Sequence, residues 1–503
     1  MTFPWLTFLG LAPLLGAAVL CLPLKDVARW VGMAFALVTA VIGIGITALY
    51  LGGQTFVERA PWIPAFGASW AVGLDGMALV MVLLTVLLVP VVLLAEWRVG
   101  GAGRWSAQTF FALVLALESL SIFTFMAEDV LLFYLFFEAT LIPMYFLIGG
   151  FGGPQRAYAA VKFLLFSLAG GLIMLASVIG LYAWSVQVTG QPTYLLSELQ
   201  QLELDPSLGR WLMLGFLVAF IVKAPMVPVH TWLPTATEQA TPGTSVLLVG
   251  ILDKIGTFGM IRFCLGLFPE ASTWIAPVMI ALALVSIIYG AVAAIGSTHL
   301  LRLVAYTSIS HFGFMVLGIY TFTSVGISGS IFYMLNHGFS TAALFLVIGF
   351  LISRRGSALV ADFGGVQKVA PVLSGVFLMA GLSGLALPGM SSFVSEFMVL
   401  AGAWSAIPWV AAVASLGTVL AAVYILLMYQ RTMTGPVTPA VAEHFTTDAT
   451  ASEKWVIGPL LAVILLLGFL PNIALNVIEP TAHQTMSIVG VTDPVAPLGE
   501  EAK

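Results

Sequence analysis

The chain has 503 residues, of which 60% are hydrophobic and only 8% are charged, and its formal net charge is −5. Soluble domains carry about 25% charged residues, and a soluble core could not bury this much apolar surface. The composition therefore excludes a soluble globular protein and indicates a lipid environment. Apolar runs of about 20 residues, the length that a spanning helix needs, recur from Thr2 to Pro471. They are continuous rather than alternating, which excludes a membrane β-barrel.

These runs predict an all-α polytopic membrane protein with about 14 transmembrane helices. The longest linkers, residues 52–72, 188–208, 353–369 and 431–453, are too short for a separate soluble domain. The tail from Val477 onward is more polar, and we expect it to be peripheral. The predicted helices lie near residues 2–23, 30–51, 73–96, 107–126, 129–149, 157–187, 209–230, 241–267, 272–297, 302–321, 325–352, 370–402, 405–430 and 454–476.

The loop charges predict how the chain is oriented, because cytoplasmic loops carry an excess of Lys and Arg. The loops after odd-numbered helices hold eleven such residues, namely Lys25, Arg29, Arg98, Arg104, Arg156, Arg302, Arg354, Arg355, Lys368, Arg431 and Lys454. The opposite side holds four, namely Arg59, Arg210, Arg262 and Lys503. Both termini are therefore expected on the non-cytoplasmic side, which requires an even number of helices. For a bacterial chain, the membrane would be the plasma membrane.

Ionisable residues inside the predicted helices are the strongest functional signal. A charge at the bilayer centre costs about 2.5–3.5 kcal/mol on insertion scales, so such residues usually have a function. Any one of them could be a structural polar group that a neighbour satisfies, but six on six helices favour a transport path. Lysine, glutamate and histidine are suited to proton transfer, and histidine can pass a proton through its two ring nitrogens. The candidates for proton translocation are Glu138, Lys223, Lys254, His311, His337 and Glu396.

Four further residues are candidate accessory groups. Lys162 lies near the start of its predicted helix and could extend its ammonium toward the interface. His230 follows the buried Lys223 in the same segment, and Glu118 could join the path or pair locally. Asp253 precedes Lys254, but neighbouring helix residues point about 100° apart and need not pair. The role of Asp253 stays open at this stage.

Two predicted helices are interrupted by proline and glycine. Helix 7 contains Pro225 and Pro228 and is followed by Pro234, and helix 12 contains Pro388 followed by Gly389. Transporters use broken helices at corresponding positions of inverted repeats. Helices 7 and 12 are five apart, which predicts inverted five-helix repeats of helices 4–8 and 9–13. The domains would be residues 1–106 (helices 1–3), 107–267 (first repeat), 268–430 (second repeat) and 431–503 (helix 14 and the tail).

No metal or nucleic-acid site is predicted. Cys21 and Cys264 are isolated within apolar segments, so their spacing does not fit a metal site. No cluster of Asp, Glu and His has the spacing of metal ligands, and no basic tract suggests nucleic acid.

Four segments resemble the antiporter-like subunits of type I NADH:quinone oxidoreductase (respiratory complex I), over nearly the whole chain. They are Phe136 to Tyr145, Val222 to Pro234, Tyr306 to His311 and Asn336 to Ser340. Within this family, Leu387 to Phe397 resembles subunit M, the counterpart of mitochondrial chain 4. Subunits L and N and the related cation/proton antiporter subunits usually carry lysine where Glu396 stands.

The resemblance implies a role for each matching residue. Glu138 and Lys223 would form a charge pair, Lys254 would be the central proton carrier, and Glu396 would be the exit-side site. His311 and His337 would continue the polar path. The resemblance also implies that this chain holds no cofactor, because flavin, iron–sulfur clusters and quinone belong to partner subunits of the complex. Neighbouring antiporter-like subunits would transmit the energy of the redox reaction.

The function expected from the sequence is proton translocation as a membrane-arm subunit of a proton-translocating NADH:quinone oxidoreductase. Protons would enter from the side rich in Lys and Arg, near helices 7 and 8. Two other transport functions share these motifs, namely a subunit of a multi-subunit Na⁺/H⁺ antiporter and a membrane subunit of a hydrogenase or formate-linked complex. A purely structural scaffold would tolerate neutral substitutions at the buried charges.

Overall fold

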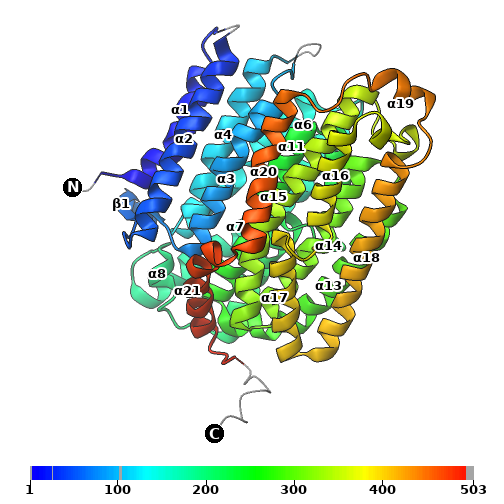
Figure 1. Cartoon of the computed structure of the whole chain (residues 1–503). Coiled ribbons are helices and arrows are strands. Elements are labelled where there is room, and N and C mark those ends of the chain that lie inside the picture. Colours follow the sequence, from blue (N-terminus) through cyan, green and yellow to red (C-terminus); the bar gives the residue numbers. More distant parts are fainter. Residues whose placement is uncertain (1–2, 25–26, 101–104, 494–503) are drawn as a thin grey trace.

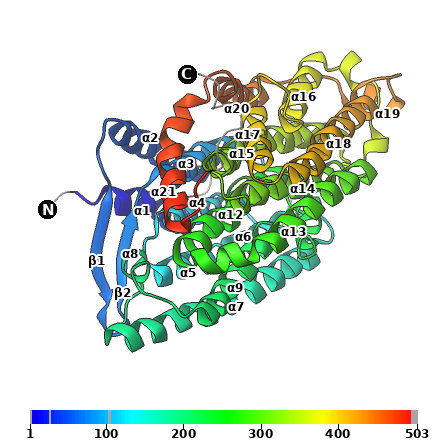
Figure 2. The ribbon, with the colours of Figure 1, turned by 90° about the horizontal axis from the view of Figure 1, so that it is seen from below.

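The computed structural model describes residues 3–24, 27–100 and 105–493, which form a bundle of long helices with one small hairpin (Figure 1). Three residues of the loop-charge count, Lys25, Arg104 and Lys503, lie outside the described residues. Seen from below, the hairpin and α18 (Pro408–Met433) lie at opposite sides of the bundle (Figure 2). The prediction of an all-α polytopic membrane protein is confirmed, since only two short strands interrupt the helices described.

The first half of the chain contains the hairpin and the helices up to the first broken segment. Its elements are α1 (Trp5–Val19), α2 (Ala28–Leu51), β1 (Val57–Ile63), β2 (Ala68–Gly73), α3 (Gly76–Ala95), α4 (Ala107–Met126), α5 (Val130–Ala139), α6 (Leu141–Phe151), α7 (Arg156–Thr189), α8 (Leu196–Leu199), α9 (Pro206–Lys223) and α10 (Trp232–Gln239).

The second half begins with a helix that contains two π-helical segments and ends with a helix in the polar tail. Its elements are α11 (Pro242–Val246), the π-helical segment Leu247–Leu252, α12 (Lys254–Gly259), the π-helical segment Met260–Leu265, α13 (Pro269–Gly296), α14 (Leu300–Tyr320), α15 (Ser324–Arg355), α16 (Pro371–Gly384), α17 (Ser391–Ala406), α18, α19 (Pro439–His444), α20 (Ala451–Phe469) and α21 (Asn472–Val489).

Local sequence signals explain where many helices begin. The side chains of Asp75, Ser106 and Asp129 accept hydrogen bonds from backbone N–H groups in the first turns of α3, α4 and α5. Such caps satisfy N–H groups that have no partner within the helix. Thr450 and Glu453 form a reciprocal capping box at the start of α20. Proline stands near the start of several other helices, where its missing N–H costs no hydrogen bond.

Exposed aromatic side chains at the helix ends fit a bilayer with two interfaces. Trp30 at the start of α2 is 68% exposed and Trp455 at the start of α20 is 73% exposed. Near the opposite end of the bundle, Trp211 is 72% exposed and Phe469 is 71% exposed. Tryptophan is enriched at both membrane–water interfaces. The 19 residues of α20 span about 28 Å at 1.5 Å per residue, close to the thickness of a hydrocarbon core.

The number of spans agrees only partly with the prediction. Twelve of the described helices are long and apolar enough to cross a membrane, or up to 13 if each bent pair counts as one span. Each of the 14 predicted segments contains a helix. Two lack an unbroken span of sufficient length: α1 has only 15 residues, and residues 370–402 are divided between α16 and α17. A total of 14 spans therefore stays a prediction, as do the inverted repeats and the domain boundaries.

One predicted linker and the C-terminal tail contain structure that the prediction lacked. The hairpin β1–β2 is antiparallel and occupies the predicted linker 52–72. The polar tail is not peripheral, because α21 packs against the start of α3. The N–H of Gly76 donates to Thr481 Oγ1 at 3.2 Å, and a Cβ on Gly76 would lie 1.8 Å from the carbonyl oxygen of Val477. The expectation was wrong because proline and polar residues obscured a helix that buries one face, with Ile478 and Ala482 fully buried.

The predicted breaks in helices 7 and 12 are confirmed. The first helix ends at Lys223 and resumes with α10 at Trp232. The second ends at Gly384 and resumes with α17 at Ser391. Within this second break, Ala386 and Gly389 have φ values of 57° and 93°, a region that α-helices do not use. Non-helical backbone at membrane depth persists only against protein or a wet cavity. The first break is buried at Ala224 and Met226, whereas the second is buried at Ala386 and exposed at Leu387 and Pro388.

Candidate functional site

The end of α9 is held by side chains that satisfy its interrupted backbone. The indole of Trp232 donates to the carbonyl oxygen of Val222 at 3.1 Å, and the N–H of Val227 donates to Ser286 Oγ at 3.0 Å. Both backbone groups lose their helical partners at the break, and these side chains supply the replacements. Lys223 is consequently the last helical residue, and it is buried beside the break.

Lys223 and Glu138 approach one another without forming an ion pair. The ammonium of Lys223 lies 5.3 Å from the ring centroid of Phe137 and 5.7 Å from that of Phe163, which is a cation–π environment. Among the described residues, neither Lys223 Nζ nor Glu138 Oε1 has a hydrogen-bond partner. The two groups are nevertheless within electrostatic range of each other. The Glu138 carboxylate lies against Gly171 of α7, so the expected charge pair has no direct contact in this structure and stays a prediction.

Lys254 is fully buried between the two π-helical segments. Its ammonium lies 2.6 Å from the carbonyl oxygen of Val249 and 2.6 Å from Nδ1 of His337 on α15. It also lies 4.9 Å from the ring centroid of Phe312. When Lys254 is protonated, Nδ1 of His337 must be the acceptor of this hydrogen bond, because an ammonium has no acceptor. π-Helical turns are frequent at functional sites, and here they flank the lysine.

A second histidine follows directly behind His337. The rings of His337 and His311, which lies on α14, have centroids 5.1 Å apart and planes at 80°. Nε2 of His311 is 3.2 Å from the hydroxyl of Tyr424 on α18, and its ring also lies beside Tyr333 at 5.8 Å between centroids. The hydroxyl of Tyr424 thus contacts His311, and Tyr333 lies beside the same imidazole. Among the described residues, His337 Nε2 and His311 Nδ1 have no hydrogen-bond partner, so the two histidines meet through their rings.

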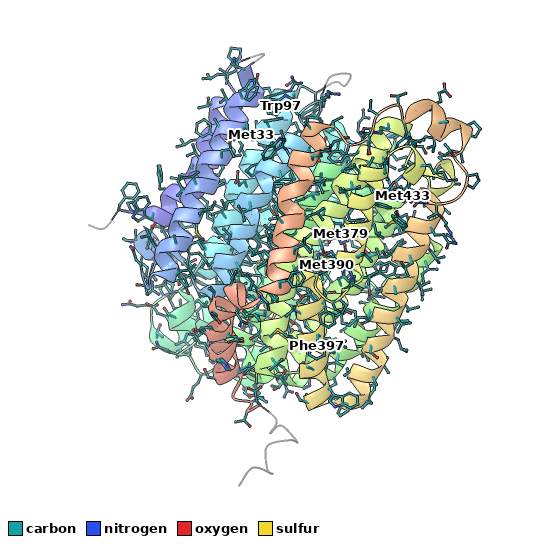
Figure 3. All side chains as sticks on the ribbon, in the orientation of Figure 1. Met33, Trp97, Met379, Met390, Phe397 and Met433 are labelled. Carbon is teal, nitrogen blue, oxygen red and sulfur yellow. The ribbon has the colours of Figure 1, made fainter. Side chains whose placement is uncertain are left out.

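Glu396 ends this path on α17. The hydroxyl of Tyr333 donates to Glu396 Oε2 at 2.7 Å, and the hydroxyl of Thr418 donates to Oε1 at 2.5 Å. Glu396 is 3% exposed. Asn336 holds the start of the same helix, because its amide donates to the carbonyl oxygen of Ser391 at 2.9 Å. Figure 3 labels Met390 at the break and Phe397 on α17, next in sequence to Glu396.

The structure joins four of the six predicted residues into one buried row, which we call the axis. The axis runs Lys254, His337, His311, then Tyr424 and Tyr333, then Glu396. The sequence analysis missed Tyr333, Tyr424 and Thr418. Their residue types fit ordinary helix packing, and no spacing signal marks their hydroxyl groups. Lys223 and Glu138 lie apart from this row, at the end of α9.

The accessory candidates occupy different surroundings. Lys162 Nζ donates to Thr235 Oγ1 of α10 at 2.9 Å, and the buried His230 stacks edge-on against Tyr289 at 4.9 Å. Both therefore lie near the first break. Glu118 is buried in α4, and neither carboxylate oxygen has a hydrogen-bond partner among the described residues. Nothing that the structure describes connects Glu118 to the axis.

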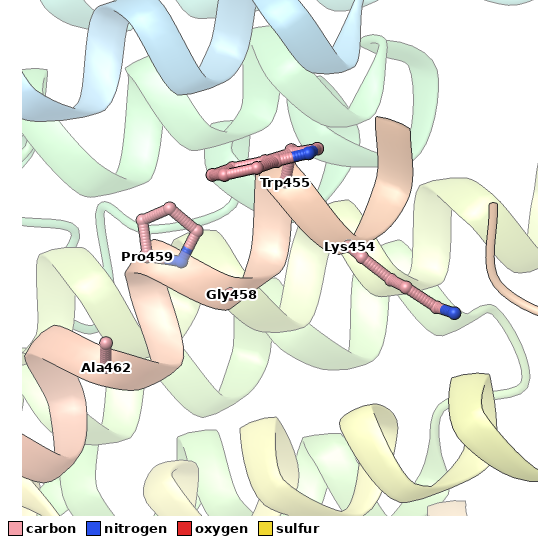
Figure 4. Close-up of a pocket in the computed structure, with 5 residues that line it drawn as sticks. All are labelled: Lys454, Trp455, Gly458, Pro459 and Ala462. Carbon is pink, nitrogen blue, oxygen red and sulfur yellow. The ribbon is translucent and has the colours of Figure 1, made fainter. Parts of the chain in front are cut away.

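Two cavities on the surface contain no residue of the axis. One, of about 360 Å³, lies on α20 and is lined by Lys454, Trp455, Gly458, Pro459 and Ala462 (Figure 4). The other, of about 200 Å³, lies between the hairpin and α21 and contains the ion pair of Arg262 with Asp75 at 2.8 Å. Within the described ranges, no three His, Cys, Asp or Glu side chains are grouped so that they could hold a metal ion.

Comparison with known proteins places the chain in a family. Residues 127–421 match the family described as NADH:quinone oxidoreductase/Mrp antiporter, TM. The chain is also 46% identical to NADH-quinone oxidoreductase subunit M of Mycobacterium tuberculosis, over 98% of this chain and 95% of the relative. The chain belongs to the subunit M family of NADH-quinone oxidoreductase. The resemblance stated from the motifs is thereby confirmed.

Solved structures agree with this membership. The subunit M family member aligns with a chain of respiratory complex I from Thermus thermophilus with a TM-score of 0.87 and 31% identity, over 97% of this chain and 100% of that one. It also aligns with a chain of the Mrp complex from Dietzia with a TM-score of 0.84 and 23% identity, over 97% and 100% of the two chains. The second alignment shows a shared fold.

Proposed function

We propose that this subunit translocates protons across the bacterial plasma membrane, as a membrane-arm subunit of a proton-translocating NADH:quinone oxidoreductase. The observation that carries the proposal is the row of buried proton-exchanging groups from Lys254 to Glu396, with the contact of 2.6 Å between Lys254 and His337 at its head. The redox groups, namely flavin, iron–sulfur clusters and quinone, would reside in partner subunits, and this chain would carry no redox centre of its own.

The row can pass a proton because each of its members can both give and accept one. Protonated Lys254 donates to His337 Nδ1, and the imidazole then releases a proton from its other nitrogen. Moving one charge against 100 mV costs about 2.3 kcal/mol. Two unit charges about 4 Å apart interact with about 4 kcal/mol at an effective dielectric constant of 20. One rearranged charge pair in a neighbouring subunit or at Glu138 and Lys223 is therefore sufficient to drive the step.

Protons would enter near the first break and leave near the second. Lys162 and His230 lie beside α10, at the end of the bundle where Arg302 pairs with Glu238 at 3.2 Å. That end carries most of the Lys and Arg residues of the loops, so it would face the cytoplasm. Glu396, beside the second break, would release the proton to the opposite side, where both termini would lie.

Substitution of Glu396 tests the proposal. In the assembled enzyme in proteoliposomes, Glu396→Gln is expected to lower proton pumping about tenfold or more, equivalent to about 1.4 kcal/mol per factor of ten. The amide keeps the volume and can still accept from Tyr333, but it cannot release a proton. Glu443→Gln, at an exposed position of α19, is the control. Assembly with undiminished quinone reduction and pumping in Glu396→Gln would refute the assignment, and sodium-dependent transport would favour the antiporter function.

The tyrosine hydroxyls provide a second, smaller test. Tyr424→Phe removes the hydroxyl next to His311, and we expect pumping to fall several-fold, because a lost hydrogen bond in the interior typically costs about 1–3 kcal/mol. Tyr320→Phe is the matched control, since Tyr320 is equally buried and its hydroxyl has no partner among the described residues. Pumping measured by quenching of a pH-sensitive dye decides the question. Equal rates in the two variants would remove Tyr424 from the path.

A further inference from the structure

Asp253 is a buried carboxylate whose role is unassigned. It directly precedes Lys254, is 0% exposed, and has no hydrogen-bond partner for either carboxylate oxygen among the described residues. Burying a charge without a partner is strongly unfavourable. In its ionised form Asp253 therefore depends on a nearby opposite charge, and Lys254 on its own element is not the only candidate.

The packing of α12 directs Asp253 toward the end of α9. Gly256 lies so close to α9 that a Cβ on it would be 2.5 Å from the backbone nitrogen of Ala224 and 2.7 Å from the carbonyl oxygen of Phe220. Residues three apart in a helix share a face, and Asp253 has helical φ and ψ values. Asp253 therefore lies on the face of α12 that packs against the end of α9, where Lys223 is the last helical residue.

Asp253 consequently lies between two lysines. The Lys254 ammonium is directed at Val249 and His337, whereas Asp253 is within electrostatic range of both Lys254 and Lys223. Lys223 is in turn within range of Asp253 and of Glu138 on α5.

The remaining ionisable groups around this cluster belong to two other helices. His337 of α15 contacts Lys254, and His311 of α14 lies behind His337. Asp253 and Glu138 are the two carboxylates within electrostatic range of Lys223, and Asp253 is also within range of Lys254.

We propose that Asp253 is a second counter-ion for Lys223 and carries the coupling between the Glu138–Lys223 pair and Lys254. This inference rests on the proposed function. When the Lys223 ammonium turns from Glu138 to Asp253, it neutralises the charge that stabilises protonated Lys254. The N–H bond of Lys254 then breaks and a bond from the same proton to His337 Nδ1 forms. When Lys223 returns to Glu138, Asp253 again favours protonation of Lys254.

The pH profile of the assembled enzyme tests this role. Asp253→Asn removes a negative charge beside two ammonium groups, so the alkaline limb of quinone reduction and proton pumping is expected to move to lower pH by about one unit, the scale of a single nearby charge. Asp253→Glu should restore the profile. Thr257→Val is the control, because it removes a buried hydroxyl that donates to the Lys254 carbonyl at 3.1 Å without removing a charge. An unchanged profile in Asp253→Asn would overturn the proposal.

A stability cycle gives a readout that does not depend on activity. Lys223→Gln leaves Asp253 short of a counter-ion, so adding Asp253→Asn should raise the melting temperature of the complex above that of Lys223→Gln alone. If the double variant instead loses the sum of the two single decreases in melting temperature, the pairing is contradicted. This comparison holds even if Asp253→Asn alone assembles poorly. The two proposals can fail separately. If Lys254→Gln stops pumping but the melting-temperature losses of the Lys223 and Asp253 variants are additive, the proposed function stands and only the role of Asp253 is refuted.

Discussion

Lys254→Gln is expected to abolish proton pumping by the assembled enzyme, with at least a tenfold loss, where each factor of ten corresponds to about 1.4 kcal/mol. Glutamine fits the volume and can still donate to the carbonyl oxygen of Val249, so packing at the π-helical segments should survive. It cannot hold an exchangeable positive charge next to His337, where the ammonium now lies 2.6 Å from Nδ1. The axis would lose its first donor, and quinone reduction should fall with it because the two processes are coupled.

The same substitution at a loop lysine provides the control for Lys254. Lys368→Gln changes an exposed residue in the loop between α15 and α16, and it should leave both rates unchanged. The measurement is proton uptake in proteoliposomes together with NADH-driven quinone reduction, after native electrophoresis has confirmed assembly. A correctly assembled Lys254→Gln enzyme that pumps at the unmodified rate would eliminate the axis as the proton path.

Gly256→Ala is expected to lower the thermal stability of the complex markedly, because Gly256 packs against the backbone at the end of α9. The new Cβ would lie 2.5 Å from the backbone nitrogen of Ala224, a contact that only movement of α12 or the end of α9 can relieve. Overpacking of this kind typically costs about 1–3 kcal/mol. The displaced backbone carries Lys223 on one side and Asp253 and Lys254 on the other, so pumping should fall as well as thermal stability.

Gly375→Ala is the matched control for this steric prediction. A Cβ on Gly375 of α16 meets no atom within 4 Å, and alanine is a better helix former than glycine by about 1 kcal/mol. The melting temperature of the purified complex should therefore fall for Gly256→Ala and stay equal or rise slightly for Gly375→Ala. Equal melting temperatures would show that α12 and α9 are packed less tightly than the structure indicates.

The sequence alone determined the class of fold and most of the ionisable residues of interest. Continuous apolar runs are sufficient to predict spanning helices, because lipid leaves the backbone no other hydrogen-bonding partner. Isolated charges within those runs, such as Lys254 and Glu396, are visible because their cost in lipid is high. The breaks were also visible, since proline at Pro225 and Pro388 cannot continue a helix without losing a bond.

Only the tertiary structure decided which of these residues meet. The contact between Lys254 and His337 joins residues 83 positions apart, and no periodicity within one helix encodes such a contact. The sequence did not reveal that Tyr333 and Tyr424 belong to the axis, because an aromatic residue in an apolar helix carries no local sign of its partner. The direction of Asp253 toward α9 likewise depends on Gly256, whose missing side chain lets two helices approach closely. The helix α21 was missed because one buried face on a polar segment becomes recognisable only against the helix that covers it.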